Sequence, residues 1–153
     1  MKSLKGLLIS ALCWMWGAGV AHACSCQPIS PEAGFDHAQY VFTGKVIQAE
    51  SHIWFVEVER VWKGHEKLAH TIKLMDVYAR MDCEFYFKLG QRYLFFAVVA
   101  KGDRHVFYHP QACNWTSPLQ SKRVPAAGNE SLWIEDLIAR EHGPGEPPRA
   151  EPP

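Results

Sequence analysis

The residues best suited to chemistry in this chain of 153 residues are its cysteines. Cys24, Cys26, Cys83 and Cys113 follow an apolar N-terminal stretch that contains the fifth, Cys13. Four cysteines in an exported domain predict two disulfides, with three possible pairings. A Cys24–Cys26 ring would be very small and strained, so the two favoured pairings tie the N-terminal pair to distant points. A four-thiolate zinc site is disfavoured, because paired zinc ligands usually have two to four residues between them.

The N-terminal residue of the exported chain is itself a candidate metal ligand. Residues 1–23 have the pattern of a secretory signal peptide: two lysines, no acid, an apolar run and a final Ala21-His22-Ala23. Cleavage there predicts a secreted, extracellular or periplasmic protein that begins at Cys24. An α-amine loses its proton near about pH 7.7–8.0, so the Cys24 amine and carbonyl could chelate a metal. A catalytic zinc keeps one position open, which such a pair of donors could occupy.

Other residues that could do chemistry have simpler explanations. His105 and His109 fall on a predicted strand, where they would be about 13 Å apart, too far to share a metal. Cys83 and Glu84 could form a nucleophile and base, but a cysteine in a disulfide cannot attack a substrate. The sequence contains no Gly-x-Ser-x-Gly, His-Glu-x-x-His or phosphate-binding glycine loop. We therefore predict neither an enzyme nor a cofactor of its own.

Charge and hydropathy exclude two further classes of protein. Without residues 1–23 the chain has 14 basic and 16 acidic residues and no basic cluster, which argues against a nucleic-acid partner. The longest later apolar run, residues 94–100, is far shorter than the roughly 18 residues of a membrane span. A chain of this size predicts one domain over residues 24–142, and we expect a monomer.

The elements that would position the terminus are a short helix and several strands. Ser30-Pro31-Glu32 is typical of a helix start and predicts a helix over residues 31–37. Gly44 predicts a bulge or a sharp coil in the first of five strands. The predicted strands are 39–50, 53–62, 70–77, 92–100 and 104–109. Alternation in the second strand places one set of side chains on one face: Trp54, Val56, Val58, Arg60 and Trp62. This number of short strands indicates a small all-β barrel or sandwich.

The C-terminal part of the chain is predicted to contain a helix and a tail. Apolar residues four apart predict a helix over residues 131–142, capped by Asn129 or Ser131. Residues 143–153 are rich in proline and glycine and have no apolar residue larger than alanine or proline. This composition predicts a disordered tail.

Several motifs resemble a known family. Cys24-Ser25-Cys26-Gln27-Pro28 resembles the mature start of the tissue inhibitors of metalloproteinases, which begin Cys-(Thr/Ser)-Cys-x-Pro. The similarity covers about residues 24–116. It continues through Pro31 and Phe35, then Val41-Phe42-x-Gly44-x-Val46, Val58-x-x-Val61-Trp62-Lys63-Gly64 and Gly90-x-x-Tyr93-Leu94-Phe95. The chain looks closest to the short, single-domain bacterial relatives, because the second domain of the animal inhibitors is absent.

The resemblance implies a fold and a site. It implies an OB-fold, a five-stranded Greek-key barrel with flanking short helices, and disulfides Cys24–Cys83 and Cys26–Cys113. The amine and carbonyl of Cys24 would bind the catalytic zinc of a zinc metalloproteinase, and Ser25 would enter its specificity pocket. The implied inhibitory ridge consists of Cys24, Ser25, Cys26, Gln27, Pro28, Ala79, Arg80, Met81 and Asp82.

The sequence departs from the family at three points. The third cysteine pair of the animal inhibitory domain is missing, with Asp36 near one of its positions. Glu84 follows Cys83 where the family often has glycine, and Asp82 adds a charge to the ridge. Bacterial lipoproteins also begin at a cysteine, and lipidation would block both the amine and the thiol. Their signals usually carry an aliphatic residue three before the cysteine, where this chain has Ala21.

Two functions are therefore expected. The leading hypothesis is a secreted inhibitor of zinc metalloproteinases that depends on Cys24 and Ser25. The alternative is a non-inhibitory extracellular or envelope OB-fold module that binds a protein or glycan through its barrel face.

Overall fold

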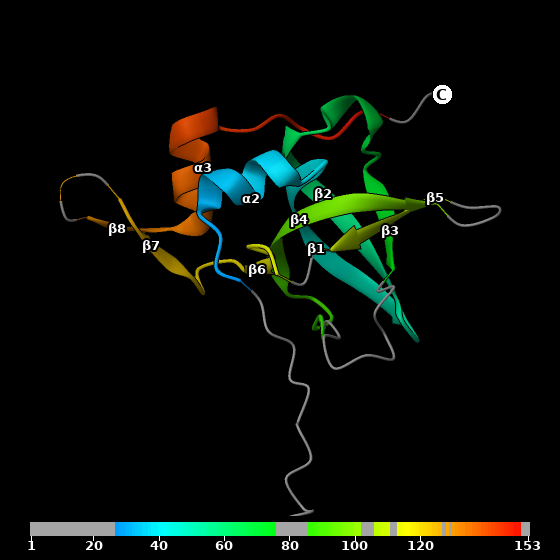
Figure 1. The fold of residues 1–153 in the computed structure, drawn as a ribbon. Helices are drawn as coiled ribbons and strands as arrows, with labels where there is room; N and C mark the ends of the chain where they lie inside the picture. Colours follow the sequence, from blue (N-terminus) through cyan, green and yellow to red (C-terminus); the bar gives the residue numbers. More distant parts are fainter. Residues whose placement is uncertain are drawn as a thin grey trace, which may run out of the picture.

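Strands make up most of the regular structure of this chain. The computed structural model describes residues 27–75, 86–101, 106–110, 113–126, 128 and 130–150 (Figure 1). The predicted mainly-β class is confirmed. In chain order the elements are α2 (Pro31–His37), β1 (Tyr40–Glu50), β2 (Ile53–Lys63), the 3₁₀ helix η1 (His65–Lys67), β3 (Thr71–Met75), β4 (Arg92–Lys101), β5 (Val106–Pro110), β6 (Ser117–Pro118), β7 (Arg123–Pro125), β8 (Ser131–Trp133) and α3 (Ile134–His142).

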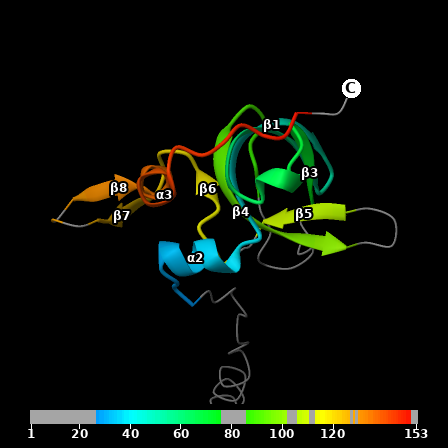
Figure 2. The same ribbon diagram turned by 90° about the horizontal axis from the view of Figure 1, so that it is seen from above.

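The strands β1 to β5 pair in an order that returns to its start. β1 is antiparallel to both β2 and β4, β2 is antiparallel to β3, and β4 is antiparallel to β5. β3 and β5 are parallel and meet at Leu74 and Tyr108. Seen from above, these strands curve around a shared interior, while β7, β8 and α3 lie to one side (Figure 2). β6 adds a short antiparallel segment to β4.

Gly44 lies at a register shift between β1 and β2, as predicted. A Cβ at this position would lie 2.5 Å from Val56 Cγ1 and 2.7 Å from the Glu57 carbonyl oxygen. Gly44 pairs with Val58, whereas Thr43 pairs with Arg60, so Glu59 of β2 has no partner in the register. The predicted face of β2 is therefore wrong beyond Val58, because this irregularity exposes Arg60 and turns Val61 inward.

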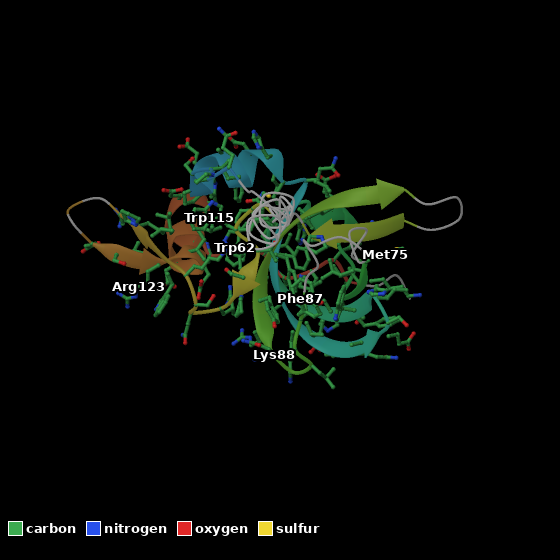
Figure 3. The ribbon with its side chains drawn as sticks, turned by 60° about the horizontal axis from the view of Figure 1, so that its bottom comes forward. Trp62, Met75, Phe87, Lys88, Trp115 and Arg123 are labelled. Carbon is green, nitrogen blue, oxygen red and sulfur yellow. The ribbon has the colours of Figure 1, made fainter. Side chains whose placement is uncertain are left out.

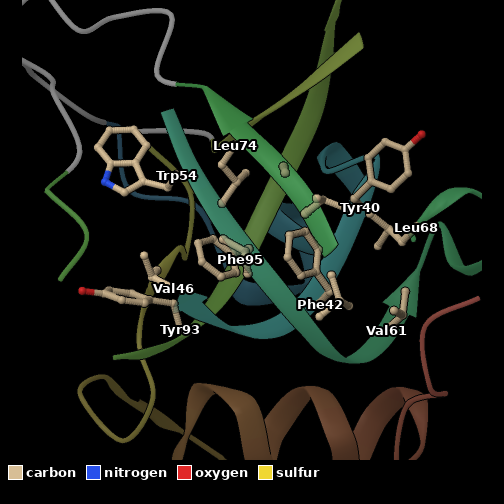
Figure 4. Packing of buried hydrophobic residues seen from close by; sticks show 13 residues of the cluster. Tyr40, Phe42, Val46, Trp54, Val61, Leu68, Leu74, Tyr93 and Phe95 are labelled. Atoms are coloured by element: carbon tan, nitrogen blue, oxygen red, sulfur yellow. The ribbon is translucent and has the colours of Figure 1, made fainter. Parts of the chain in front are cut away.

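Two apolar clusters stabilise the fold. The first fills the space inside β1 to β5, where Phe42 stacks on Phe95 with ring centroids 5.0 Å apart (Figure 4). Phe87 packs against this cluster and contacts Trp54 edge-on at 5.2 Å. The second cluster lies under α2 and α3 and contains Phe35, Ala38, Val41, Leu94, Phe96, Val124, Ile134, Leu137 and Ile138. β4 serves both clusters because its successive side chains point to opposite faces.

α2 has the predicted bounds and is capped at both ends. The Ser30 hydroxyl accepts a hydrogen bond of 3.1 Å from the Ala33 amide, and Pro31 occupies the first turn. At the other end, the Lys63 ammonium donates to the carbonyls of Phe35 at 2.8 Å and Asp36 at 2.9 Å. Since the last carbonyls of a helix lack partners within it, Lys63 ties α2 to the end of β2.

The predicted helix over residues 131–142 is wrong at its start. Residues 131–133 form β8 and pair with β7, and α3 begins only at Ile134. Trp133 is the N-cap residue, in extended conformation and without a side-chain cap bond, so Ser131 is not the cap, and Asn129 lies outside the described residues. β7 provides backbone partners for these residues, and the Arg123 guanidinium lies 4.4 Å from the Trp133 ring centroid.

The prediction of a disordered tail is wrong for residues 143–150, which we call the strap. The strap runs back from α3 across the end of β2 (Figure 1). Val61 and Glu146 exchange two backbone hydrogen bonds of 2.8 Å, and the Arg149 amide donates to the Leu68 carbonyl at 3.1 Å. Backbone pairing with a neighbouring strand therefore orders a segment that has few apolar side chains. Residues 151–153 lie outside the described residues.

Within the part of the chain that the structure describes, neither helix has the length and apolar character needed to cross a bilayer.

Candidate functional site

Most of the predicted inhibitory ridge lies outside the described residues. This holds for the signal segment 1–23 and for Cys24, Ser25 and Cys26. It also holds for the second half of the ridge, Ala79, Arg80, Met81 and Asp82, and for Cys83. The described ridge residues are Gln27 and Pro28, and the described cysteine is Cys113. The geometry around these three residues is therefore the basis for judging the site.

The N-terminal segment, residues 27–30, leads directly into α2. Gln27 and Pro28 are exposed, and Ile29 is half-buried. The indole of Trp115, which is labelled in Figure 3, donates a hydrogen bond of 3.2 Å to the Ile29 carbonyl and so fixes the segment. Pro28 and Pro31 have a fixed φ, and each also restricts the backbone of the residue before it. The segment is thus held at its Ile29 end while its first residues face solvent.

Residues 113–115 also contact the start of α2. Cys113 is disulfide-bonded, and the other four cysteines of the chain all lie outside the described residues. The Asn114 side-chain amide donates 3.0 Å to the Gly34 carbonyl, and its oxygen accepts 2.7 Å from the Trp115 amide. A Cβ on Gly34 would lie 2.7 Å from Trp115 Cδ1 and closer still to the Asn114 side-chain oxygen. The contact therefore requires glycine at position 34.

A hollow of about 310 Å³ lies where the two segments meet. Its lining residues are Gln27, Pro28, Ile29, Cys113, Asn114, Trp115 and Lys122. The Lys122 ammonium lies 5.6 Å from the centroid of the Trp115 ring. Lys122 is exposed as a residue, yet the packing around its amine desolvates the charge and lowers its pKa below the usual value. This hollow brings the start of the described chain next to a disulfide-bonded cysteine.

A second, larger hollow of about 450 Å³ adjoins the first at Ile29 and Trp115. It extends under the start of α2 and over α3, where Leu137 lies on its wall. Arg140 and Glu141 contribute charged side chains to its lining. Arg140 also approaches Glu130 at 3.6 Å. Ile29 of the N-terminal segment and Trp115 thus line both hollows.

The other chemical candidates do not form a site among the described residues. That part of the chain contains no group of three His, Cys, Asp or Glu side chains able to hold a metal ion. His105 lies outside the described residues, and His109 belongs to β5. Trp54 is buried in the first cluster, whereas Trp62 and Trp115 are half-buried against the second.

Sequence reasoning missed the residues that position the N-terminal segment. Asn114, Trp115 and Gly34 form a contact between segments about 80 residues apart, and no local pattern indicates such a contact. The usable signal was Cys113 itself, because a predicted disulfide to the terminus places its neighbours in the sequence near the terminus too.

Comparisons with known proteins give no match from which a function could be assigned. No model of a known protein family matches the chain, and no curated protein matches it. The function of the site must follow from its geometry and from the motif at the predicted mature terminus.

Proposed function

We propose that this protein is an inhibitor of zinc metalloproteinases that binds the catalytic zinc of its target through the amine and carbonyl of Cys24. The observation that carries the proposal is the hollow shared by residues 27–29 and 113–115. It brings the residue after Cys26 beside the disulfide-bonded Cys113. This proximity supports the Cys26–Cys113 pairing that the resemblance implies, with Cys24–Cys83 as the second disulfide.

The proposed scaffold is an OB-fold, a five-stranded Greek-key barrel with flanking short helices. The pairing order β1–β2–β3–β5–β4 with a return to β1 supports this fold. So does the single parallel contact between β3 and β5, since the OB-fold is a partly open barrel. In this fold the N-terminal segment would lie across the outside of the barrel.

The proposed mechanism uses a rigid terminus and no chemistry on the target. The Cys24 amine, when deprotonated, and the Cys24 carbonyl would fill the open position of the target's zinc in place of its water or substrate. Ser25 would enter the specificity pocket, and residues 79–82 would pack alongside. Trp115 and Asn114 bind the carbonyls of Ile29 and Gly34, which follow the ridge in the chain, so little conformational freedom would be lost on binding. Gln27 and Pro28 are exposed, as residues that enter a protease cleft must be.

The test is a tight-binding titration against a small panel of zinc metalloproteinases. The mature chain would first be checked by mass for a free Cys24 amine and two disulfides. The matched control carries one extra methionine before Cys24, and a second control has an acetylated amine. We expect inhibition by the mature chain and a loss of about 100-fold or more in both controls, since each removes one zinc donor.

Two results would contradict the proposal in different ways. Equal potency of the methionine-extended protein would rule out chelation by the amine while leaving inhibition by another route. No inhibition by a correctly oxidised mature chain would rule out the inhibitor and favour the OB-fold binding module, whose partner would contact the barrel face.

A further inference from the structure

The strap covers a stretch of β2 that β3 leaves open. Pairing between β2 and β3 ends at Glu57 and Thr71, with one more backbone bond from the Val58 amide to the His70 carbonyl at 2.8 Å. Beyond this point β2 diverges from β3, and the strap takes over the pairing at Val61. Unpaired strand edges bind other extended chains readily, so natural proteins cover them. The strap is the cover of this edge.

Side chains of β2 hold the first half of the strap. The Trp62 indole donates 2.8 Å to the Gly143 carbonyl, and the Arg60 guanidinium donates 3.1 Å to the Pro144 carbonyl. Gly145 packs directly on the Trp62 ring, since a Cβ there would lie 2.9 Å from Trp62 Cε2. These contacts are independent of pH in the physiological range, because indole and guanidinium groups keep their protons.

His65 holds the second half of the strap with both of its ring nitrogens. Nε2 lies 2.6 Å from the Pro147 carbonyl oxygen, and Nδ1 lies 3.3 Å from Glu146 Oε2. A carbonyl and an ionised carboxylate can only accept hydrogen bonds, and a neutral imidazole has one N–H. Both contacts are therefore satisfied together only when His65 carries a proton on each nitrogen.

The charged groups around His65 come from the strap and from both neighbouring elements. On the strap, Glu146 contacts the imidazole, and the Arg149 guanidinium donates 3.3 Å to the Glu66 carbonyl of η1. On β2, the Lys63 ammonium is directed to the carbonyls at the end of α2. The described groups thus place a carboxylate against the imidazole, while the lysine of β2 is engaged with α2.

We propose that the strap is a pH-dependent clasp, held on the β2 edge by protonated His65 and loosened when His65 loses its second proton. Imidazole side chains gain that proton at about pH 6.5 in the absence of other influences. The clasp is therefore tightest in mildly acidic solution and weakens as the pH rises through neutrality. Opening frees the backbone of Val61 and exposes the edge of β2.

Amide hydrogen exchange on the full mature chain tests this proposal at single residues. The reporters are the Glu146 and Arg149 amides, whose partners are the Val61 and Leu68 carbonyls. After correction for intrinsic exchange rates, we expect these amides to open about five to ten times more often at about pH 8 than at about pH 5.5, because one charge-assisted bond is lost.

Two variants make the result decisive. His65→Gln cannot gain a charge, so it should show the high-pH opening at both pH values. His37→Gln, at the end of α2, is the matched control and should keep the pH dependence of the wild type. Exchange at the buried Phe95 amide monitors global unfolding and should not change. Equal opening at both pH values in the wild type, or a pH dependence that survives in His65→Gln, would overturn the proposal.

Discussion

The two terminal segments of the described chain are held in different ways. The strap at the C-terminal end is fixed by backbone pairing, with hydrogen bonds between Val61 and Glu146 in both directions, and by side chains of β2 and η1 that contact its carbonyls. The N-terminal segment is fixed by side chains, chiefly the Trp115 indole on the Ile29 carbonyl and the Ser30 cap of α2. Backbone pairing depends little on side-chain identity, whereas the N-terminal contacts need particular residues.

This difference indicates what each end can do. A segment paired along a strand uses its own backbone groups to stay in place. The N-terminal segment is held at its Ile29 carbonyl, and Gln27 and Pro28 before it are exposed to solvent. The N-terminal segment is thus suited to presenting the chain terminus to a target, and the strap is suited to covering the edge of β2. Substitutions that act on one end and not the other test this contrast.

The largest effect is expected at Gly34. Glycine to alanine inside a helix usually stabilises by about 1 kcal/mol. At Gly34 the added Cβ would collide with the Trp115 ring and the Asn114 side chain, and such overpacking costs about 1–3 kcal/mol or more. We expect Gly34→Ala to lower the free energy of unfolding by about 2 kcal/mol in urea titrations.

A double-mutant cycle separates this collision from an effect on α2 alone. Asn114→Ala removes one of the two clashing side chains. The double variant should therefore be more stable than the sum of the single changes predicts, by about 1 kcal/mol. Strict additivity would mean that Gly34 matters for a reason other than its contact with residues 114 and 115.

The next effect is expected at Gly145 in the strap. Its φ of 73° is in the left-handed region, and a Cβ would press on Trp62. Gly143 is no matched control, because its φ of 84° and ψ of −177° lie in a region that only glycine adopts readily. Backbone strain at a left-handed residue costs about 1–2 kcal/mol, so Gly145→Ala should open the strap by more than this amount.

Hydrogen exchange at the Glu146 amide measures the opening of the strap in Gly145→Ala and in the wild type. An increase worth only about 1–2 kcal/mol would mean that the packing of Gly145 on Trp62 contributes nothing beyond backbone strain. The substitution should not alter the N-terminal segment, which has no contact with the strap among the interactions described above.

The smallest effect on stability, yet the most specific for function, is expected at Trp115. Trp115→Phe keeps much of the ring in the second cluster but removes the hydrogen bond to the Ile29 carbonyl, worth about 1 kcal/mol. On the proposed function, inhibition should weaken about tenfold while the unfolding midpoint changes little. Trp133→Phe, which lies on β8 and lacks this bond, is the control. Unchanged inhibition would remove Trp115 from the positioning of the terminus.

The parts of the fold that the sequence predicted well are those that local physics determines. α2 has the predicted bounds because a serine cap and a proline at the first turn are local signals. The five longer strands were found because each has several alternating or β-branched residues. β7 and β8 have three residues each, too few to show a pattern.

The strap and the site were harder to predict because both depend on distant partners. The composition of residues 143–150 is the same for a disordered tail and for a strap, and the open edge of β2 decides between them. The cysteines predict where the terminus is tied, and among the described residues Cys113 lines the same hollow as Gln27. The glycine, asparagine and tryptophan that form the contact come from two segments that only the folded chain brings together.

The packing of Gly145 on Trp62 also has an evolutionary consequence. A large indole that donates to the strap can be accommodated only if the residue two positions later on the strap has no side chain. We expect relatives of this chain to keep or lose this tryptophan and glycine together. Lineages that have lost the pair should protect the β2 edge by another means, such as a lysine or proline on the strand itself.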